Sequence, residues 1–187
     1  MWTWLIKRRL TAFERKFDYN LDYAREILDA DLGAFLRFAR IGGLSTYRRD
    51  VPLEVYYAVK LTSVVLADCG PCTQLVVTMA IHDGVDPRTI AAVLEGREPR
   101  LAAEVWLGVR FARAVAAHDP AADELRDEIL RRWGPRALVS LAFAITAARL
   151  YPTIKYALGH GQACRRVVVA GETVVPGVPD LAAGHAA

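Results

Sequence analysis

The sequence predicts an all-α protein, and three observations support this prediction. Apolar residues recur every three or four positions along nearly the whole chain, which is the period of an amphipathic helix. Glycine and proline fall between these periodic segments, where they begin or end helices. The stretch with an extended pattern, "RRVVVAGETVVPG", comes late, at 165–177. A chain of 187 residues can bury a substantial core, so we expect a single helical domain over 1–187.

The N-terminal segment, 1–19, predicts an amphipathic helix. Its apolar face is formed by Trp2, Ile6, Leu10, Phe13 and Phe17. We expect this face to pack on the domain or on a neighbouring subunit. The alternative is that Trp2 and Trp4, with the three basic residues that follow, lie on a membrane surface.

The next helices are expected at 20–29, 31–41, 52–68, 69–84 and 86–94. Paired glycines in "IGGLS" should end the second of these. Pro52 opens the third, and Pro71 lies in the first turn of the fourth, where the missing N–H costs nothing. Asp86 is placed to cap the fifth, directly before Pro87.

Three more helices are expected at 100–117, 121–133 and 134–158, the last bent at Pro152. The apolar run at 137–151 is about 15 residues long, whereas a membrane span needs roughly 20. We therefore interpret it as a buried core helix and expect no transmembrane segment. Residues 165–177 should form a strand or an extended tail, and the last eight residues, 180–187, a frayed end.

Composition narrows the class of protein. The chain is 53% hydrophobic and 24% charged, which is typical of a globular protein. A net charge of +3 with no basic stripe argues against nucleic-acid binding. Three cysteines are too few for a disulfide scaffold and suit a reducing compartment, so we expect a cytoplasmic protein.

The motif that carries chemistry is "CGPC" at 69–72. Cys69 and Cys72 are three positions apart at a helix start, on the same side and within disulfide reach. Backbone N–H groups there favour a thiolate, whereas the neighbouring Asp68 disfavours a second negative charge. We interpret the pair as a redox dithiol; the alternative is two inert, buried thiols. A thioredoxin fold is disfavoured because a helix, not a strand, precedes the motif.

A zinc site is the alternative role for the two cysteines. Cys69 and Cys72 would need two more ligands, for which His160 and Cys164 are the candidates. The two halves of such a site are about 90 residues apart in sequence. We therefore expect no metal and no organic cofactor. We also expect Cys164 not to pair with either of the other cysteines.

An all-helical chain in which a long apolar helix precedes a Cys-x-x-Cys helix resembles the carboxymuconolactone decarboxylase superfamily, in its alkylhydroperoxidase-like branch. The resemblance is best over 50–95. It implies a helical alkylhydroperoxidase-like fold, assembly into dimers, trimers or hexamers, and peroxide or disulfide reduction without a cofactor. Peroxidases of this kind carry Glu-x11-Cys-x2-Cys-x3-His. Here Tyr57 stands at the glutamate position and Val76 at the histidine position.

Other groups are candidates for the missing proton relay. Glu54 lies one turn before Tyr57 and reaches the site if the two helices pack, or else is a solvated charge. Tyr57 either donates a hydrogen bond to the site or is a core aromatic. His160, between glycines, either approaches the site or ends the long helix. The candidate catalytic residues are thus Cys69, Cys72, Glu54, Tyr57 and His160.

These observations predict a homo-oligomeric, thiol-dependent oxidoreductase, a peroxidase or disulfide reductase. Its partners would be a peroxide or disulfide substrate and a thiol reductant protein. One alternative is a lyase of the decarboxylase type, which would need a pocket with a general base and no dithiol. Another is a non-catalytic helical oligomer with structural cysteines.

Overall fold

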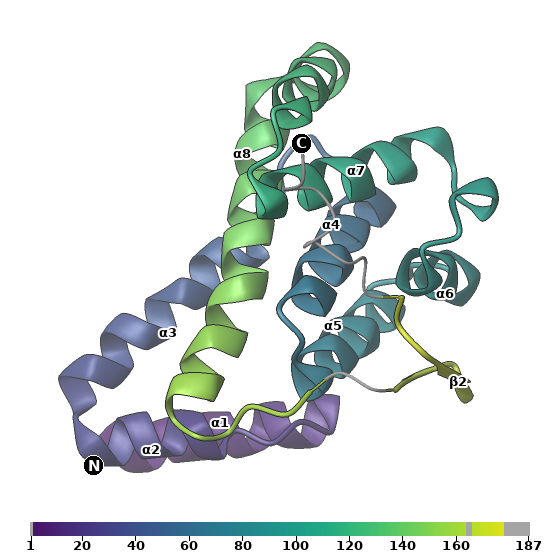
Figure 1. The fold of residues 1–187 in the computed structure, drawn as a ribbon. Coiled ribbons are helices and arrows are strands. Elements are labelled where there is room, and N and C mark those ends of the chain that lie inside the picture. The colour runs from purple at the N-terminus through teal and green to yellow at the C-terminus, as the bar shows by residue number, and fades with distance from the viewer. Residues whose placement is uncertain (1, 164–165, 178–187) are drawn as a thin grey trace.

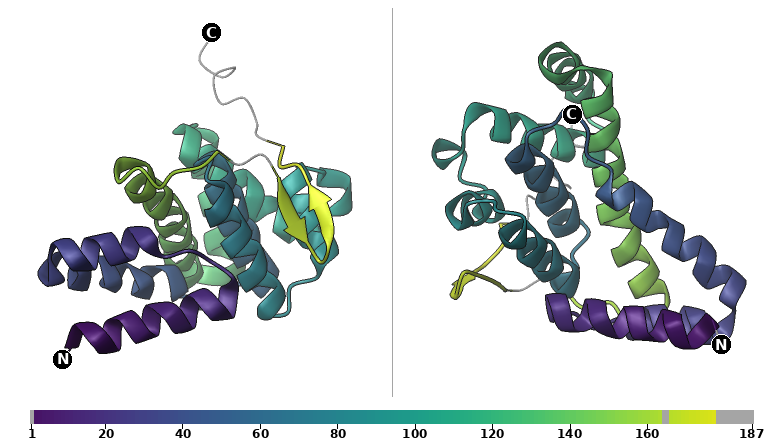
Figure 2. Two further views of the ribbon diagram at one scale, coloured as in Figure 1. Left: turned by 90° about the horizontal axis from the view of Figure 1, so that it is seen from below. Right: turned by 180° about the vertical axis from the view of Figure 1, so that it is seen from behind.

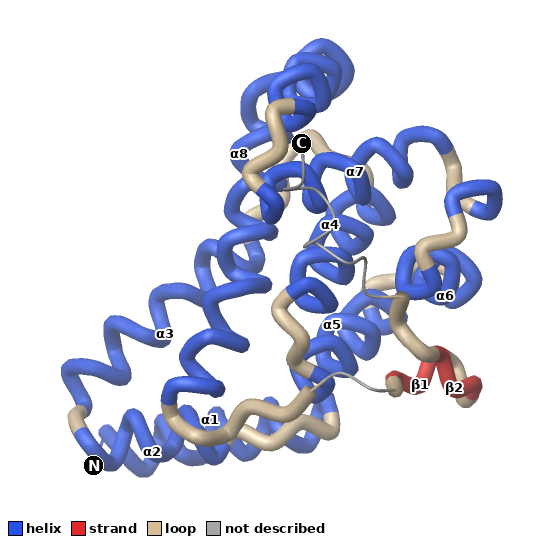
Figure 3. The backbone as a smooth tube through the Cα atoms, viewed as in Figure 1, coloured by secondary structure: helices blue, strands red, loops and turns tan. Residues whose placement is uncertain are grey.

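The computed structural model describes residues 2–163 and 166–177, which form eight α-helices and one two-stranded sheet (Figures 1 and 3). The prediction of an all-α fold is confirmed. The helices are α1 (Trp2–Phe17), α2 (Asp22–Ala30), α3 (Leu32–Thr46), α4 (Leu53–Leu66), α5 (Gly70–His82), α6 (Pro87–Glu95), α7 (Ala103–Ala117) and α8 (Ala121–Ala157). A short 3-10 turn, Glu98–Arg100, separates α6 from α7. The strands are β1 (Val167–Val169) and β2 (Glu172–Val174).

Helix α4 is the centre of the core. Eleven of its 14 residues are buried, and α5, α6, α7 and α8 all pack against it (Figure 2). Gly108 lets α7 approach closely, because a Cβ there would lie 3.0 Å from Cγ1 of Val55 and 3.2 Å from Cγ2 of Val59. The apolar α4 segment before the cysteines is therefore a core helix.

Helices α1 and α2 pack across the ends of α3, α5 and α8 and enclose a second apolar cluster (Figure 1). The α1 residues that face this cluster include Ile6, Leu10, Phe13 and Phe17, as the period predicted. The side chain of Trp2, also predicted on this face, lies outside the described part of the structure. Leu75 of α5 and Ile154 of α8 complete the contact. On the other side of α1, Trp4 is 61% exposed.

Helix α3 is longer than predicted, since it continues through Gly42 and Gly43 to Thr46. The expected stop at the paired glycines is wrong. Glycine weakens a helix interior by only about 1 kcal/mol. That cost is offset at the end of α3, where the Ser45 carbonyl accepts hydrogen bonds from Tyr56 Oη at 2.7 Å and Lys60 Nζ at 3.1 Å.

Helix α8 comprises the two helices predicted at 121–133 and 134–158. They meet at Gly134, whose φ of 78° and ψ of 179° break the helix. The bend expected at Pro152 is not accompanied by non-helical dihedral angles there. The helix is long and apolar enough to cross a membrane, a test that the core helix of a soluble protein also passes. Its apolar run is buried at Ala137, Leu141, Ala144, Ile145 and Ala148.

The predicted extended segment contains a small antiparallel hairpin. Ala170 and Gly171, both at positive φ, make its turn. The side-chain amide of Gln74 on α5 holds β1: its Nε2 donates to the Val168 carbonyl at 2.9 Å, and its Oε1 accepts from the Val168 N–H at 2.7 Å. Gln74 therefore bonds β1 as a neighbouring strand would.

Candidate active site

The two cysteines open α5. Cys69 is the N-cap residue, and Cys72 lies in the first turn behind Pro71. Their Cα atoms are 5.3 Å apart and the sulfurs are at disulfide distance. The connection from α4 turns at Asp68, which has a positive φ of 48°. The sequence prediction of a cysteine pair at a helix N-terminus is confirmed.

Both cysteines are buried, with exposures of 0% for Cys69 and 4% for Cys72. Cys69 is covered although it lies at a helix start, because the segment after α8 packs over it. The Gly70 N–H donates to the Gln162 carbonyl at 2.9 Å, and Tyr156 Oη donates to the Asp68 carbonyl at 2.7 Å. Since Pro71 has no N–H, fewer first-turn amides remain to stabilise a thiolate than the sequence suggested.

A buried polar chain reaches the pair from two distant segments. Tyr19, in the turn between α1 and α2, places its hydroxyl 3.8 Å from the Cys72 sulfur. Lys155, near the end of α8, donates from Nζ to the Tyr19 hydroxyl at 3.3 Å. The Lys155 ammonium also lies over the rings of Tyr19 and Tyr23, at 4.9 and 5.3 Å from their centroids. Tyr19, Tyr23 and Lys155 are all less than 8% exposed.

Burial changes the acid–base properties of this chain. It raises the pKa of Tyr19 to about 12, so the phenol stays protonated near neutral pH. It lowers the pKa of Lys155, because a buried ammonium loses its hydration. The hydroxyl of Tyr19 can therefore accept one hydrogen bond and donate another, and Lys155 is easier to deprotonate than an exposed lysine.

The structure places two of the predicted site residues at the far end of the α4–α5 pair. Tyr57 hydrogen-bonds Asp83, eleven residues beyond Cys72 and thus about 16 Å along the helix. Glu54 lies in the first turn of α4, about 18 Å before its last residue, Leu66. Neither is brought to the cysteines.

His160 lies nearer. It is in the segment that covers Cys69, and its Nε2 is 2.7 Å from Glu26 Oε2. Its backbone N–H donates to the Lys155 carbonyl at 2.8 Å, which fixes the end of α8. The side chain is thus engaged by α2, in keeping with the alternative that His160 ends the long helix. Val76, one turn after Cys72, is 7% exposed and adds an apolar group to the same helix.

Tyr19 and Lys155 are the residues that the sequence analysis missed. They lie 53 and 83 positions from Cys72 in sequence, so no local spacing connects them to it. One signal was present: Lys155 is a lone charge in the apolar segment "YPTIKYAL". A buried charge needs a partner, so such a lysine indicates a polar contact.

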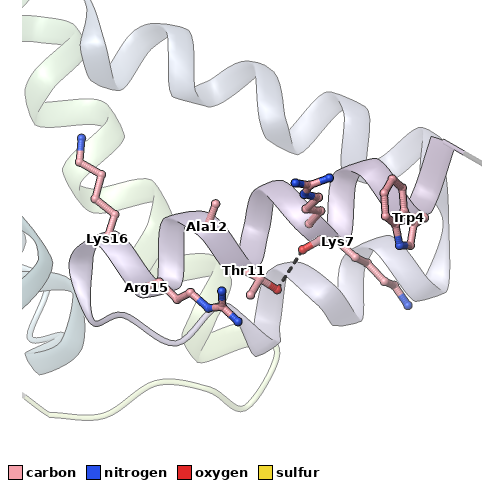
Figure 4. Close-up of a pocket in the computed structure, with 7 residues that line it drawn as sticks. Trp4, Lys7, Thr11, Ala12, Arg15 and Lys16 are labelled. Carbon is pink, nitrogen blue, oxygen red and sulfur yellow. Dashed lines mark hydrogen bonds between the residues drawn. The ribbon is translucent and has the colours of Figure 1, made fainter.

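Two other kinds of site have less support in the structure, a metal site and a surface groove. In the described ranges, no three His, Cys, Asp or Glu side chains are grouped as a metal ion would require, and Cys164 of the zinc alternative lies outside those ranges. The exposed face of α1 forms a shallow basic groove (Figure 4). It is lined by Trp4, Lys7, Arg8, Thr11, Ala12, Arg15 and Lys16. All of these come from one exposed helix face, which brings no second segment to the groove, so it is no candidate active site.

Comparison with known proteins adds no further assignment, because no family model, curated protein or solved structure matches the chain. The site is therefore defined by its own geometry.

Proposed function

We propose that the protein is a dithiol–disulfide oxidoreductase that uses Cys69 and Cys72. The observation that carries this proposal is the placement of both sulfurs at disulfide distance at the start of α5. The Tyr19 hydroxyl beside Cys72 supports it, because inert thiols would need no polar partner in an apolar core. The resemblance to alkylhydroperoxidase-like proteins points to the same chemistry.

Cys72 is the attacking thiol in the proposed cycle, since its sulfur contacts the polar chain. Its thiolate attacks the peroxide, breaks the O–O bond and becomes a sulfenic acid, while the alkoxide leaves as an alcohol after taking one proton. The Cys69 thiol then displaces water from the sulfenic acid and forms the disulfide. A dithiol reductant supplies two electrons and two protons to restore both thiols by exchange. With a disulfide substrate, the dithiol passes its electrons on in the same way.

The lyase alternative has less support, because a decarboxylase-type site needs a pocket with a general base. The described part of the chain has instead a cysteine pair at disulfide distance. The remaining alternative is a structural disulfide in a non-catalytic helical protein, and it is decided by experiment.

The deciding experiment is a peroxide-consumption assay with a dithiol reductant such as dithiothreitol. We expect turnover by the natural chain and a loss of at least about 100-fold in Cys72→Ser. Cys69→Ser should turn over more slowly, because dithiothreitol must reduce the Cys72 sulfenic acid directly. Cys164→Ser is the matched control and should keep its rate. A natural chain that consumes neither peroxide nor a small disulfide, although its thiols titrate, would contradict the proposal and favour a structural pair.

A further inference from the structure

Val76 stands where peroxidases of the resembled type carry the histidine that relays protons. The buried residues beside Cys72 suggest which groups take over that role here. Tyr19, from the first inter-helix turn, and Lys155, from the last turns of α8, meet at a sulfur of α5. Three segments far apart in sequence thus contribute to one continuous chain of atoms, with contacts of 3.8 and 3.3 Å.

We infer that Tyr19 and Lys155 form the proton relay of Cys72, with Tyr19 as a catalytic residue that touches the sulfur and Lys155 as a positioning residue that acts through it. The relay deepens the proposed function and rests on it. In the reduced protein the relay begins with Lys155 as the neutral amine: the thiol proton passes to the Tyr19 oxygen while the Tyr19 proton passes to the Lys155 nitrogen, which then donates to Tyr19 as it does in the structure. The product is a thiolate that accepts a hydrogen bond from Tyr19, which in turn accepts one from the Lys155 ammonium. The same proton returns to the alkoxide when the O–O bond breaks, so the charges balance.

Burial makes both residues suited to these roles. Tyr19 keeps its proton near neutral pH and therefore conducts a proton without becoming a phenolate. An ammonium held behind it by two aromatic rings favours negative charge on the sulfur, because the interior screens charge poorly.

Other ionisable groups lie around the Cys72–Tyr19–Lys155 relay, on each of the segments that pack against it. They are Tyr23 and Glu26 of α2, Tyr151 of α8, Asp68 before Cys69, His160 after α8, and the Glu14–Arg25 pair of α1 and α2. His160 and Glu26 pair with each other, as do Glu14 and Arg25. Among the contacts of the described residues, the Tyr19 hydroxyl is the side-chain hydrogen-bonding group at the Cys72 sulfur.

The test is the pH dependence of iodoacetamide alkylation of Cys72, measured in a Cys69→Ser/Cys164→Ser background and normalised to each protein's high-pH plateau. We expect a background midpoint below the ordinary thiol value of about 8.5. Tyr19→Phe, which removes one hydroxyl, should raise that midpoint by about one to two pH units, the worth of one hydrogen bond to a charged group. Lys155→Met should raise it by a similar amount, and the double variant by little more than either alone, because all act through one chain.

Tyr56→Phe is the matched control, since it removes a tyrosine hydroxyl that donates to the Ser45 carbonyl at the other end of α4, away from the sulfurs. It should leave the midpoint unchanged. Superimposable profiles for the background and Tyr19→Phe would overturn the relay, and because Tyr19→Phe alters so little, this result stands even if Lys155→Met does not fold. The alkylation assay uses no peroxide, so the proposed function and the relay can fail separately.

Discussion

At the scale of single residues, two of the described lysines are buried in the core, and the ammonium of each lies over two tyrosine rings. Lys155 lies over two tyrosine rings near the cysteines, and Lys60 lies over the rings of Tyr56 and Tyr57 at the other end of α4. Each is a lone charge in an apolar helical segment, and each ammonium donates to one oxygen. Burying a cation in this way is costly, and its cost depends on pH.

Lys60 makes that dependence measurable. Burial lowers its pKa to about 8, with the charge of Asp83 acting in the opposite direction. Unfolded lysine has a pKa of about 10.4, so between these values the unfolded chain binds more protons than the folded one. The free energy of unfolding should therefore rise with pH across this window, by about 2 kcal/mol from Lys60 alone.

Urea unfolding of the natural chain and of Lys60→Met at a series of pH values tests this. The change in the free energy of unfolding between about pH 8 and 10 should be less positive in the variant by about 2 kcal/mol, since the other titrating groups, Lys155 among them, are common to both proteins. Parallel curves for the two proteins would show that Lys60 does not titrate in the folded state within that window.

At the scale of elements, two helical glycines differ in whether their surroundings have room for a side chain. Gly42 lies inside α3 with open space where a Cβ would go, whereas Gly108 on α7 faces Val55 of α4 at 3.0 Å. Gly42→Ala should raise the free energy of unfolding by about 0.5–1 kcal/mol through helix propensity. Gly108→Ala gains the same propensity but must displace a fully buried valine, so we expect a net loss of about 1 kcal/mol.

Thermal and denaturant unfolding of the two variants measures the contrast. Each serves as the other's control, because both changes add one methyl group to a helical glycine. Equal effects would mean that α7 shifts outward freely and that the α4–α7 contact is not tightly packed.

At the scale of the whole molecule, apolar side chains remain exposed where α1 and α3 begin. Lys7 pairs with Asp29 at this corner, beside the start of α3. Trp4 and Leu5 of α1 are 61% and 48% exposed, and Leu36 of α3 is 49% exposed. We propose that a second copy of the chain covers this corner, in line with the homo-oligomer expected from the sequence.

Sedimentation equilibrium at micromolar concentration should therefore find an assembly larger than a monomer. Leu36→Glu should shift it toward the monomer, whereas Val139→Glu, an exposed change on α8, should not. A natural chain that sediments only as a monomer would contradict this prediction.

The sequence was sufficient for features that depend on neighbours along the chain. Helical period gave the inward face of α1, and Pro52, Pro71 and Asp86 marked three helix starts correctly. The end of α3 was missed because the bonds that support it come from Tyr56 and Lys60 on another helix.

In the candidate site, too, residues that are close in sequence could be predicted, and residues brought together by packing could not. Cys69 and Cys72 are neighbours on one helix, so their spacing alone indicated a pair. Tyr19 and Lys155 reach them only through the packing of α1, α2 and α8 on the start of α5, and no spacing in the sequence encodes that packing. Tyr57 and Glu54 were predicted to reach the cysteines from the preceding helix. However, α4 and α5 run in opposite directions, so these two positions lie far from the sulfurs.

The covering of the cysteines by the segment after α8 has a kinetic consequence. Residues 159–163 contain no helix or strand, and their hydrogen bonds to other described segments include Gly70 to Gln162 and His160 to Glu26. Releasing them should need much less free energy than unfolding the domain. Any reagent must then wait for this opening, so we expect the rate to level off as reagent concentration rises. At that ceiling, chemically different substrates would react at one common rate, and selectivity between them would appear only at low concentration.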